Sequence, residues 1–386
     1  MAYKPSDLGE VPDGWQSVKL GAIMKVRQGL QIPISERLKK PTPTSMEYIT
    51  IQSINRTGQE REYVESPSSR VVCNTEDVLM TRTGNTGIVV TGVRGAFHNN
   101  FFLMDFNRKK IDRFFLVNYL RSPRVQHLIL IKAGASTIPD LNHKDFYSID
   151  FPLAPLPEQK KIAQILSTWD NAISATERLL ENSQQRKKAL MQQLLTGKKR
   201  LPGFEGEWRR IELGELLDYE QPTPYLVKST EYSDRFSTPV LTAGKTFLLG
   251  YTDETQGIYD ADLPVIIFDD FTTASKFVTF PFKAKSSAMK ILKAKQNVSI
   301  KYVFEAMQMI TFAVGGHQRH WISIFANIVV SVPSFAEQQA IANVLTTADQ
   351  EIDALQKRLG HLKLEKKALM QQLLTGKRRV QVDAAA

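Results

Sequence analysis

Residues 187–198 read KKALMQQLLTGK, and the same twelve letters return at 366–377. The constant separation of 179 residues also places Asp349 where the first copy has Asp170, and no gap is needed. A looser repeat opens each half of the chain, where a tryptophan is followed five residues later by Leu-Gly. The chain is therefore built from two copies of one plan, and each copy is a variable block followed by a nearly fixed segment.

The fixed segments have the spacing of a long helix with a single apolar seam. The seam positions recur at alternating steps of four and three, a heptad pattern that keeps one stripe of a helix against a partner. The first seam comprises Ile162, Leu166, Trp169, Ile173, Thr176, Leu180, Ser183, Lys187, Leu190 and Leu194. The second seam comprises Ile341, Leu345, Ala348, Ile352, Leu355, Leu359, Leu362, Lys366, Leu369 and Leu373.

Both helices have predictable ends. Pro157 lies where proline is tolerated in a first turn, and Gly197 and Gly376 follow the last turns, as expected of C-terminal caps. The first helix is therefore expected over about 157–196, roughly 60 Å at about 1.5 Å per residue. Because a large block separates the two helices, we expect the chain to return and lay the second helix antiparallel to the first. Pairing between the helices of two chains, which would give a dimer, is the alternative.

The two variable blocks share one order of strand-like runs, turns and a helical stretch. In the first block the strand-like runs are 47–52, 77–82, 87–93 and 100–106, and the helical stretch is 114–133. In the second block the strand-like runs are 263–268 and 276–282, and the helical stretch is 300–312. Each block is expected to be an α+β domain with a mainly antiparallel sheet, and the pattern leaves the strand order open. The expected boundaries are 1–154 and 201–333 for the blocks, 155–200 and 334–379 for the helices, and 380–386 for a tail that derives in part from cloning.

The composition narrows the class of protein. The single cysteine, Cys73, cannot form an internal disulfide and fits the reducing cytoplasm. The chain has no signal-peptide core and no run of about 18 apolar residues, so we expect a soluble cytoplasmic protein. The net charge of +10 indicates an acidic partner, and +5 of it lies in 155–200 and +3 in 334–379. Solvated basic helix ends are the alternative explanation for these clusters.

Polar residues gather in loops at matching places in the two blocks. In the first block they are Arg82, Thr83, Asn85, Thr86, Ser136, Thr137, Asn142 and Lys144. In the second block they are Lys245, Asp269, Thr272, Thr273, Lys276, Gln318, Arg319 and His320. Arg, Asn and Gln can bind purine edges, Asp can accept from cytosine, and Ser and Thr can hold phosphates. We therefore predict that these sixteen residues contact DNA; a plain hairpin turn is the alternative for TRTGNTG at 81–87.

The sequence contains only incomplete versions of two motifs found in enzymes, a phosphate-binding loop and a metal site. The stretch 242–246 ends like a phosphate loop, but the required first glycine is Pro239. His317 and His320 lack a third ligand nearby, which argues against a metal site. We therefore expect no catalytic residues and no metal in this chain.

The repeated motifs resemble those of the DNA-specificity (HsdS) subunits of type I restriction–modification systems. The motif Glu-Gln-x-x-Ile-Ala opens each helix, and Leu-Leu-Thr-Gly-Lys closes each. These motifs lie at 158–163, 337–342, 194–198 and 373–377. The resemblance covers essentially the whole chain, and one departure from it is Ala336, where the first copy has Pro157.

The resemblance implies that each block is a target recognition domain that reads one half of a bipartite, asymmetric DNA sequence. It implies that the helices form an antiparallel coiled coil, which sets the spacing of the halves and docks two modification (adenine methyltransferase) subunits. Restriction and translocase subunits would complete a phage-defence assembly. S-adenosylmethionine, ATP and Mg²⁺ would then belong to the partner subunits, and none to this chain. A coiled-coil scaffold with protein-binding blocks is the alternative, and a nuclease or methylase fragment is a further rival.

Overall fold

The computed structural model describes residues 11–54, 61–134, 137–242, 244, 246–311 and 320–382. The chain forms two compact units. Unit 1 comprises Met1–Thr176 and Arg358–Ala386, and unit 2 comprises Glu177–Lys357. The two long helices, α6 (Leu156–Leu194) and α10 (Phe335–Leu373), each give one half to each unit. Each unit is thus a folded block together with two helix segments.

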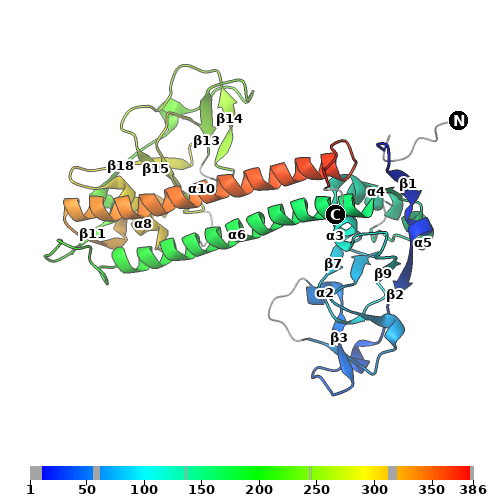
Figure 1. Ribbon diagram of the computed structural model, residues 1–386. Helices are drawn as coiled ribbons and strands as arrows, with labels where there is room; N and C mark the ends of the chain where they lie inside the picture. The colour runs from blue at the N-terminus through cyan, green and yellow to red at the C-terminus, as the bar shows by residue number, and fades with distance from the viewer. Residues whose placement is uncertain are drawn as a thin grey trace. The chain divides into compact units, whose positions relative to one another are not determined.

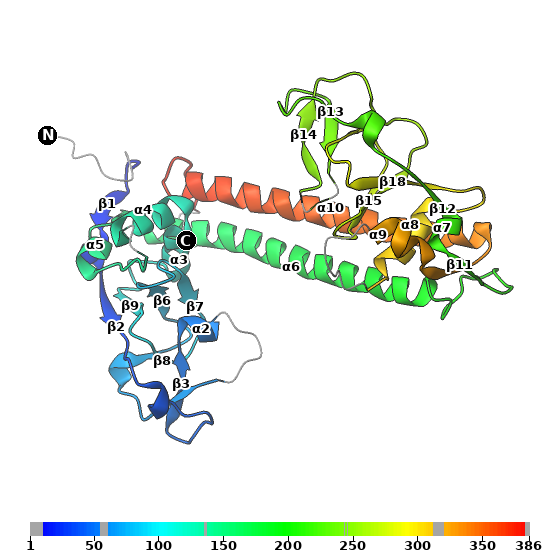
Figure 2. The same cartoon turned by 180° about the vertical axis from the view of Figure 1, so that it is seen from behind.

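Unit 1 contains a helical layer and two larger sheets. Its strands are β1 (Gln16–Lys19), β2 (Met24–Gln28), β3 (Ser45–Ile49), β4 (Tyr63–Glu65), β5 (Val72–Cys73), β6 (Val78–Thr81), β7 (Val89–Thr91), β8 (Gly95–Phe97), β9 (Phe101–Phe106) and β10 (Asp150–Leu153). Its shorter helices are α1 (Leu20–Ile23), α2 (Ile51–Ile54), α3 (Arg113–Arg121), α4 (Pro123–Ala133) and α5 (His143–Tyr147). The sheet orders are β2-β9-β6-β7, β4-β3-β8-β5 and β1-β10. Figure 2 shows α3, α4 and α5 at the end of unit 1 where α6 and α10 run, with β3 and β8 at the other end.

Unit 2 has the same topology but a different amino-acid sequence. Its strands are β11 (Arg209–Glu212), β12 (Leu217–Glu220), β13 (Thr238–Leu241), β14 (Leu248–Thr252), β15 (Val265–Asp269), β16 (Ser275–Val278), β17 (Lys283–Ala284), β18 (Met289–Ala294) and β19 (Val329–Val332). Its shorter helices are α7 (Leu213–Leu216), α8 (Ile300–Gln308) and α9 (His320–Ser323). The orders β12-β18-β15-β16, β14-β13-β17 and β11-β19 match β2-β9-β6-β7, β4-β3-β8 and β1-β10 of unit 1 (Figure 1). The sheets are mainly antiparallel, as predicted, and the pairs β3–β8 and β13–β17 are the equivalent parallel exceptions.

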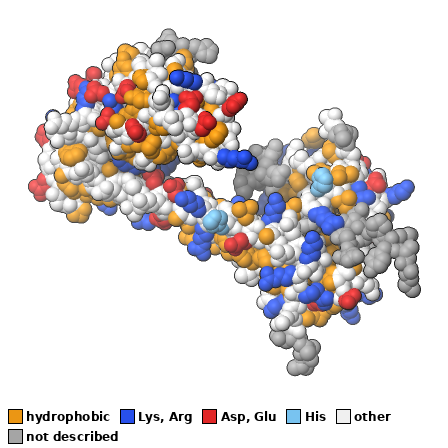
Figure 3. Space-filling view, turned by 90° about the horizontal axis from the view of Figure 1, so that it is seen from above, with side chains coloured by type: hydrophobic (Ala, Val, Ile, Leu, Met, Phe, Trp, Pro, Cys, Tyr) orange, Lys and Arg blue, Asp and Glu red, His pale blue; other side chains and the backbone are white. Residues whose placement is uncertain are grey.

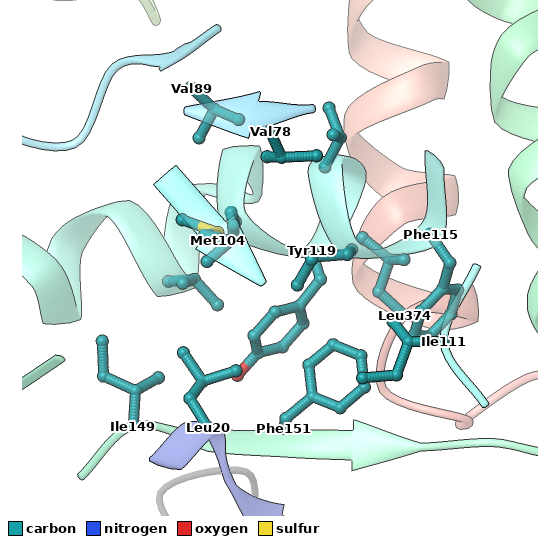
Figure 4. Packing of buried hydrophobic residues seen from close by; sticks show 14 of the residues in the cluster. Leu20, Val78, Val89, Met104, Ile111, Phe115, Tyr119, Ile149, Phe151 and Leu374 are labelled. Atoms are coloured by element: carbon teal, nitrogen blue, oxygen red, sulfur yellow. The ribbon is translucent and has the colours of Figure 1, made fainter. Parts of the chain in front are cut away.

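One apolar core of unit 1 joins the sheet, the short helices and the long helices. Phe115 and Tyr119 of α3 face Phe151 of β10, and Leu374, just after α10, closes the same cluster (Figure 4). The ring pairs Phe115–Phe151 and Tyr119–Phe151 meet edge-to-face at 5.8 and 5.0 Å. Because these side chains come from distant parts of the sequence, their burial fixes the block on its helix segments. Unit 2 has the equivalent cluster, in which Tyr302 and Leu195 take part.

The two long helices confirm the seam and the caps. Every one of the twenty seam positions is buried or half-buried. Gly197 and Gly376 have φ of +71° and +74°, the left-handed conformation that ends a helix. Beyond each cap the same backbone bond forms, from Lys199 N to Gln193 O and from Arg378 N to Gln372 O, both 3.1 Å. Within the described residues, no helix combines the length and the apolar character needed to cross a bilayer.

Ion pairs inside each unit establish that the helices pair antiparallel within one chain. In unit 1, Lys366 of α10 binds Asp170 of α6. In unit 2, Lys187 of α6 binds Asp349 of α10 at 2.6 Å. These are the same interaction under the repeat, because a shift of 179 exchanges the partners. The helices therefore need no second chain to bury their seams, which answers the dimer alternative.

A second repeated contact joins the start of each long helix to the end of the other. Arg200 binds Glu337 through two hydrogen bonds of 2.6 and 2.7 Å, and its guanidinium lies 5.7 Å from the Trp208 ring centroid. The equivalent pair is Arg379 with Glu158, and Arg379 lies 5.9 Å from the centroid of Trp15. Each unit therefore contains the same cluster of a glutamate, an arginine and a tryptophan, and the cluster repeats with the sequence.

The glutamine of the Glu-Gln motif links each long helix to the block. Buried Gln159 accepts from the backbone N–H of Asp112, the N-cap of α3, at 2.8 Å. Buried Gln338 accepts from the N–H of Ser299, the N-cap of α8, at 3.0 Å. Their side-chain amides also donate to backbone carbonyls, so the buried polar groups are satisfied.

The helix expected over 114–133 is interrupted. It is split into α3 and α4 at Ser122–Pro123, because proline lacks the N–H that a continuing helix requires and restricts the residue before it. The second helical stretch is also shorter than expected, since α8 ends at Gln308.

The Glu158 salt bridge gives unit 1 a defined dependence on pH. Burial alone raises the pKa of Glu158, but hydrogen bonds from Arg379 and Trp15 outweigh it and hold the pKa below its ordinary value. A depressed pKa stabilises the folded state above the unfolded value of about 4.3, and this contribution is lost as the pH falls. At pH 7 we expect Glu158→Gln to lower the free energy of unfolding by about 1–2 kcal/mol. As the pH falls below about 4.3 toward the depressed pKa of the folded state, the difference between the variant and the wild type should shrink.

Thermal unfolding followed by circular dichroism between pH 3 and pH 7 measures this difference. Glu231→Gln, which removes an exposed carboxylate of unit 2, is the control and should leave the curves unchanged. A gap between wild type and Glu158→Gln that stays constant down to pH 3 would contradict the assignment.

Candidate nucleic-acid interface

The polar loop after β6 is joined to the segment before α5 in unit 1. The Arg82 guanidinium donates to both carboxylate oxygens of Asp140 at 2.8 Å, and the Thr83 hydroxyl donates to the same carboxylate at 2.5 Å. The Thr86 hydroxyl donates to the carbonyl of Pro139 at 2.8 Å. We call residues 81–87 and 137–144 loop pair 1.

Several candidate residues of loop pair 1 are already engaged within the protein. The Arg82 side chain is 16% exposed and lies 5.5 Å from the centroid of the Phe102 ring. Thr86 is buried, so both residues hold the loops together. Asn142 caps α5 by accepting from Asp145 N at 2.9 Å. Residues with exposed side chains in loop pair 1 include Asn85, Thr137 and Lys144.

Unit 2 joins its equivalent loops through a buried charge. The Asp270 carboxylate accepts from the Trp321 N–H at 2.8 Å and lies 3.6 Å from the Lys290 ammonium. The Asp270 carbonyl accepts from the His320 N–H and faces its ring Nδ1, both at 2.9 Å. Asp270, Lys290 and His320 are each only 1% exposed. His320 is therefore part of the internal support and is not presented to solvent.

One backbone hydrogen bond occupies the same place in both units. Leu141 N donates to Arg82 O at 2.8 Å, and His320 N donates to Asp270 O at 2.9 Å. Both bonds join the residue next to a central strand with the residue at or just before a short helix. We call residues 269–276 and 320–323 loop pair 2. The sequence prediction that these loops occupy matching places is consistent with this equivalence.

The other described candidates of unit 2 lie on the hairpin formed by β15 and β16. Asp269 is buried, and its carboxylate accepts from Phe271 N at 2.9 Å and Thr272 N at 3.3 Å. Thr272 and Lys276 are exposed, and Thr273 is half-buried. Thr273 has a φ of +60°, which closes the turn. Four further candidates lie outside the described residues: Ser136, Lys245, Gln318 and Arg319.

Two acidic residues that support the loops, Asp140 and Asp270, are not among the sixteen residues predicted from the sequence. The signal that could have found Asp140 is the charge complementarity between the two candidate loops of the first block. Asp270 has no such signal, because its partner Lys290 lies on a strand that reads as core.

The excess positive charge lies entirely on one unit. Unit 1 has 29 Lys and Arg against 19 Asp and Glu, which is the whole net charge of +10. Unit 2 has 21 of each sign and is neutral. On the face in Figure 3, blue side chains outnumber red ones over unit 1, on the right of the view, whereas both signs are mixed over unit 2. Long-range attraction of a polyanion therefore falls mainly to unit 1.

Comparisons with known proteins identify relatives of the whole chain. A profile of the family described as "Type I restriction modification DNA specificity domain" matches residues 12–182 and 205–364. The specificity subunit of the type I restriction enzyme EcoR124I/EcoR124II of Escherichia coli is 50% identical over 159 residues, 38% of this chain and 39% of that protein. The specificity subunit of the type I restriction enzyme MjaVIII of Methanocaldococcus jannaschii is 23% identical over 418 residues, 96% of this chain and 94% of that protein.

Solved structures support the same fold. The S subunit of a type I restriction–modification system from M. genitalium superposes with a TM-score of 0.65 at 15% identity, covering 96% of this chain and 99% of that one. A chain from a structure that describes complex assembly of the type I R-M system has a TM-score of 0.54 at 17% identity, covering 96% and 100%. At these identities the likeness concerns the fold alone.

The buried ion pair at the base of loop pair 2 should dominate the stability of unit 2. Asp270→Asn keeps an acceptor for Trp321 but leaves the Lys290 ammonium buried and unpaired. Breaking a buried pair in this way costs about 3–5 kcal/mol, whereas replacing both partners costs much less. We therefore expect a large loss in Asp270→Asn and a partial recovery in Asp270→Asn with Lys290→Met. Urea unfolding of the three proteins measures the difference, and a loss below about 1 kcal/mol in the single variant would contradict the role of the pair.

Proposed function

Because this chain belongs to the type I restriction–modification DNA-specificity family, we propose that its two units each read one half of a bipartite DNA target. The observation that carries this proposal is the repeated loop pair, in which an equivalent backbone hydrogen bond joins the two segments in both units while the side chains differ. Different side chains at equivalent places select different bases. The target is therefore asymmetric. The long helices α6 and α10, which each contribute a segment to both units, set the spacing of its two halves.

We assign distinct roles to the candidate residues. The exposed Asn85, Thr137 and Lys144 of unit 1 and the Thr272, Thr273 and Lys276 of unit 2 contact DNA. The residues that are hydrogen-bonded within the protein hold the loops that present these contacts. They are Arg82, Thr83, Thr86, Asn142, Asp269 and His320. DNA contacts are also assigned, from their residue types alone, to Ser136, Lys245, Gln318 and Arg319. Unit 1, which carries the excess charge, provides most of the salt-dependent affinity for phosphates.

We further propose that the identical ends of the two helices bind two copies of one partner, the modification subunit. Packing explains identity at buried positions such as Met191 and Leu194, but it does not explain identity at exposed ones. Lys188 and Gln192 are exposed, lie one turn apart on one helix face, and recur as Lys367 and Gln371. Exposed positions earlier in the repeat have diverged, as at Glu181 against Gly360 and Asn182 against His361.

Equivalent grooves lie beside these two surfaces. In unit 1 the groove is lined by Tyr119, Ser122, Gln371 and Thr375, among others. In unit 2 it is lined by Ala306, Met309, Leu195 and Thr196, among others. Two like grooves next to two like helix ends support two like partners in a cytoplasmic assembly, and S-adenosylmethionine, ATP and Mg²⁺ would be bound by those partners.

Exchange of one block tests modular reading. Replacing residues 209–333 with the matching block of a relative should change one half of the methylated motif and leave the other half intact. The reason is that each loop pair is supported entirely within its own unit. Methylation mapping by sequencing measures the motif in cells that carry either protein. Modular reading would be wrong if both halves changed together.

Charge reversal on one helix end tests partner binding. Lys188→Glu with Gln192→Glu should remove one copy of the modification subunit and leave the second copy on the unaltered end. Native mass spectrometry of the purified assembly measures the number of copies. Glu181→Lys with Asn182→Lys alters the same helix at diverged positions and serves as the matched control. An assembly that keeps both copies would exclude this surface from docking.

A further inference from the structure

An aromatic side chain stands at the tip of the hairpin between β15 and β16. Phe271 is 39% exposed, and it lies between buried Asp270 and exposed Thr272. A single exposed apolar side chain is common on a protein surface, so the meaning of Phe271 depends on the loop that presents it.

The hairpin holds the backbone of Phe271 in a fixed turn. The Asp269 carboxylate accepts from the N–H of Phe271 at 2.9 Å, and Asp269 N donates to Ala274 O at 2.8 Å. Thr273 N donates to Asp269 O at 2.9 Å with a φ of +60°, a conformation that is costly for a residue with a branched side chain. Local polar bonds thus hold the backbone of the turn.

The base of the turn is fixed to the core of unit 2. Asp270 binds the backbone of Trp321 and His320 and pairs with Lys290, as described above. The Trp321 ring packs on Phe268, with the ring centroids 5.3 Å apart. Two buried charges and a left-handed residue therefore support a loop whose largest side chain is 39% exposed. Such an arrangement is expected where a side chain must be presented in a defined place.

We propose that Phe271 makes an apolar contact with the bases of the half-site read by unit 2. This inference rests on the proposed function and names a specificity residue that polar motifs do not reveal. Thr272 and Lys276 on the same hairpin supply neighbouring phosphate contacts, whereas a phenyl ring has no favourable contact with a phosphate. The bases offer two apolar features, the thymine methyl in the major groove and the stacked faces that a wedge separates.

The test uses the complete assembly with its modification subunits and two duplexes. One duplex carries the cognate motif, and the other has the second half scrambled. Phe271→Ala should weaken binding to the cognate duplex about ten- to a hundredfold, the range expected for an apolar side chain removed from a closed contact. Binding to the scrambled duplex should stay within about twofold of wild type. Phe271→Leu, which keeps an apolar group, should recover part of the loss.

Phe280→Ala is the matched control, because this ring is 41% exposed in the same unit but follows Val278, which pairs with Val265 at the opposite end of β15 from the turn. It should bind the cognate duplex as the wild type does. Cognate binding by Phe271→Ala within about twofold of wild type overturns the contact, while a successful block exchange would leave the proposed function intact. A wild-type assembly that does not distinguish the two duplexes would overturn the proposed function and this inference with it.

Two modified duplexes then distinguish the base features. Thymine-to-uracil replacement that weakens the wild type but not Phe271→Ala identifies a methyl contact. A rise in 2-aminopurine fluorescence that only the wild type produces identifies a wedge. Absence of both signals, with alanine binding unchanged, excludes Phe271 from the site.

Discussion

The structure depends on two long helices pairing antiparallel along one apolar seam. Within unit 1 the pairing brings Asp170 to Lys366, and within unit 2 it brings Asp349 to Lys187. Burial alone raises the pKa of Asp349, but the bonds from Lys187 and Lys301 outweigh it and hold that pKa below its ordinary value. The carboxylate therefore stays charged where charged partners face it. A seam interrupted by Lys at both of these positions is weaker than an all-apolar seam, but its register is defined.

The fixed helices explain why the variable blocks can differ so widely. Each block is attached by the same few contacts: a Glu–Arg salt bridge beside a tryptophan, a buried glutamine that binds the N-cap of α3 or α8, and a shared apolar cluster. The salt bridge and the buried glutamine lie at the ends of the helices, away from the loop pairs, whereas the apolar clusters extend to Leu141 and Trp321. A change at the exposed positions of a loop therefore leaves the attachment intact, which is the physical condition for exchanging one block without disturbing the helices.

Most helices and strands could be predicted from the local spacing of apolar residues. The strand order and the break in one helix could not. The seam, both glycine caps and the central strands were predictable because each depends on a few neighbouring residues. The break at Ser122–Pro123 was missed because the apolar spacing continues through it. Strand order was not accessible, since β6 and β15 are continuous apolar runs without alternation and pair with strands distant in sequence. For the candidate site, the sequence predicts which loops carry polar residues, and the structure adds which of those side chains face solvent.

The loop pairs show why residue types alone do not predict which polar side chains face solvent. Arg82 and His320 are the kinds of residue that bind bases, yet here each bonds to a neighbouring loop, and unlike polar groups perform the same support in the two units. Polar character therefore identifies the loop but not the role of the residue, because supporting and contacting side chains draw on the same chemistry. What separates them is burial. A recognition surface that must stay rigid in water needs a polar interior of its own, and the residues that form it are as specific as those that touch the target.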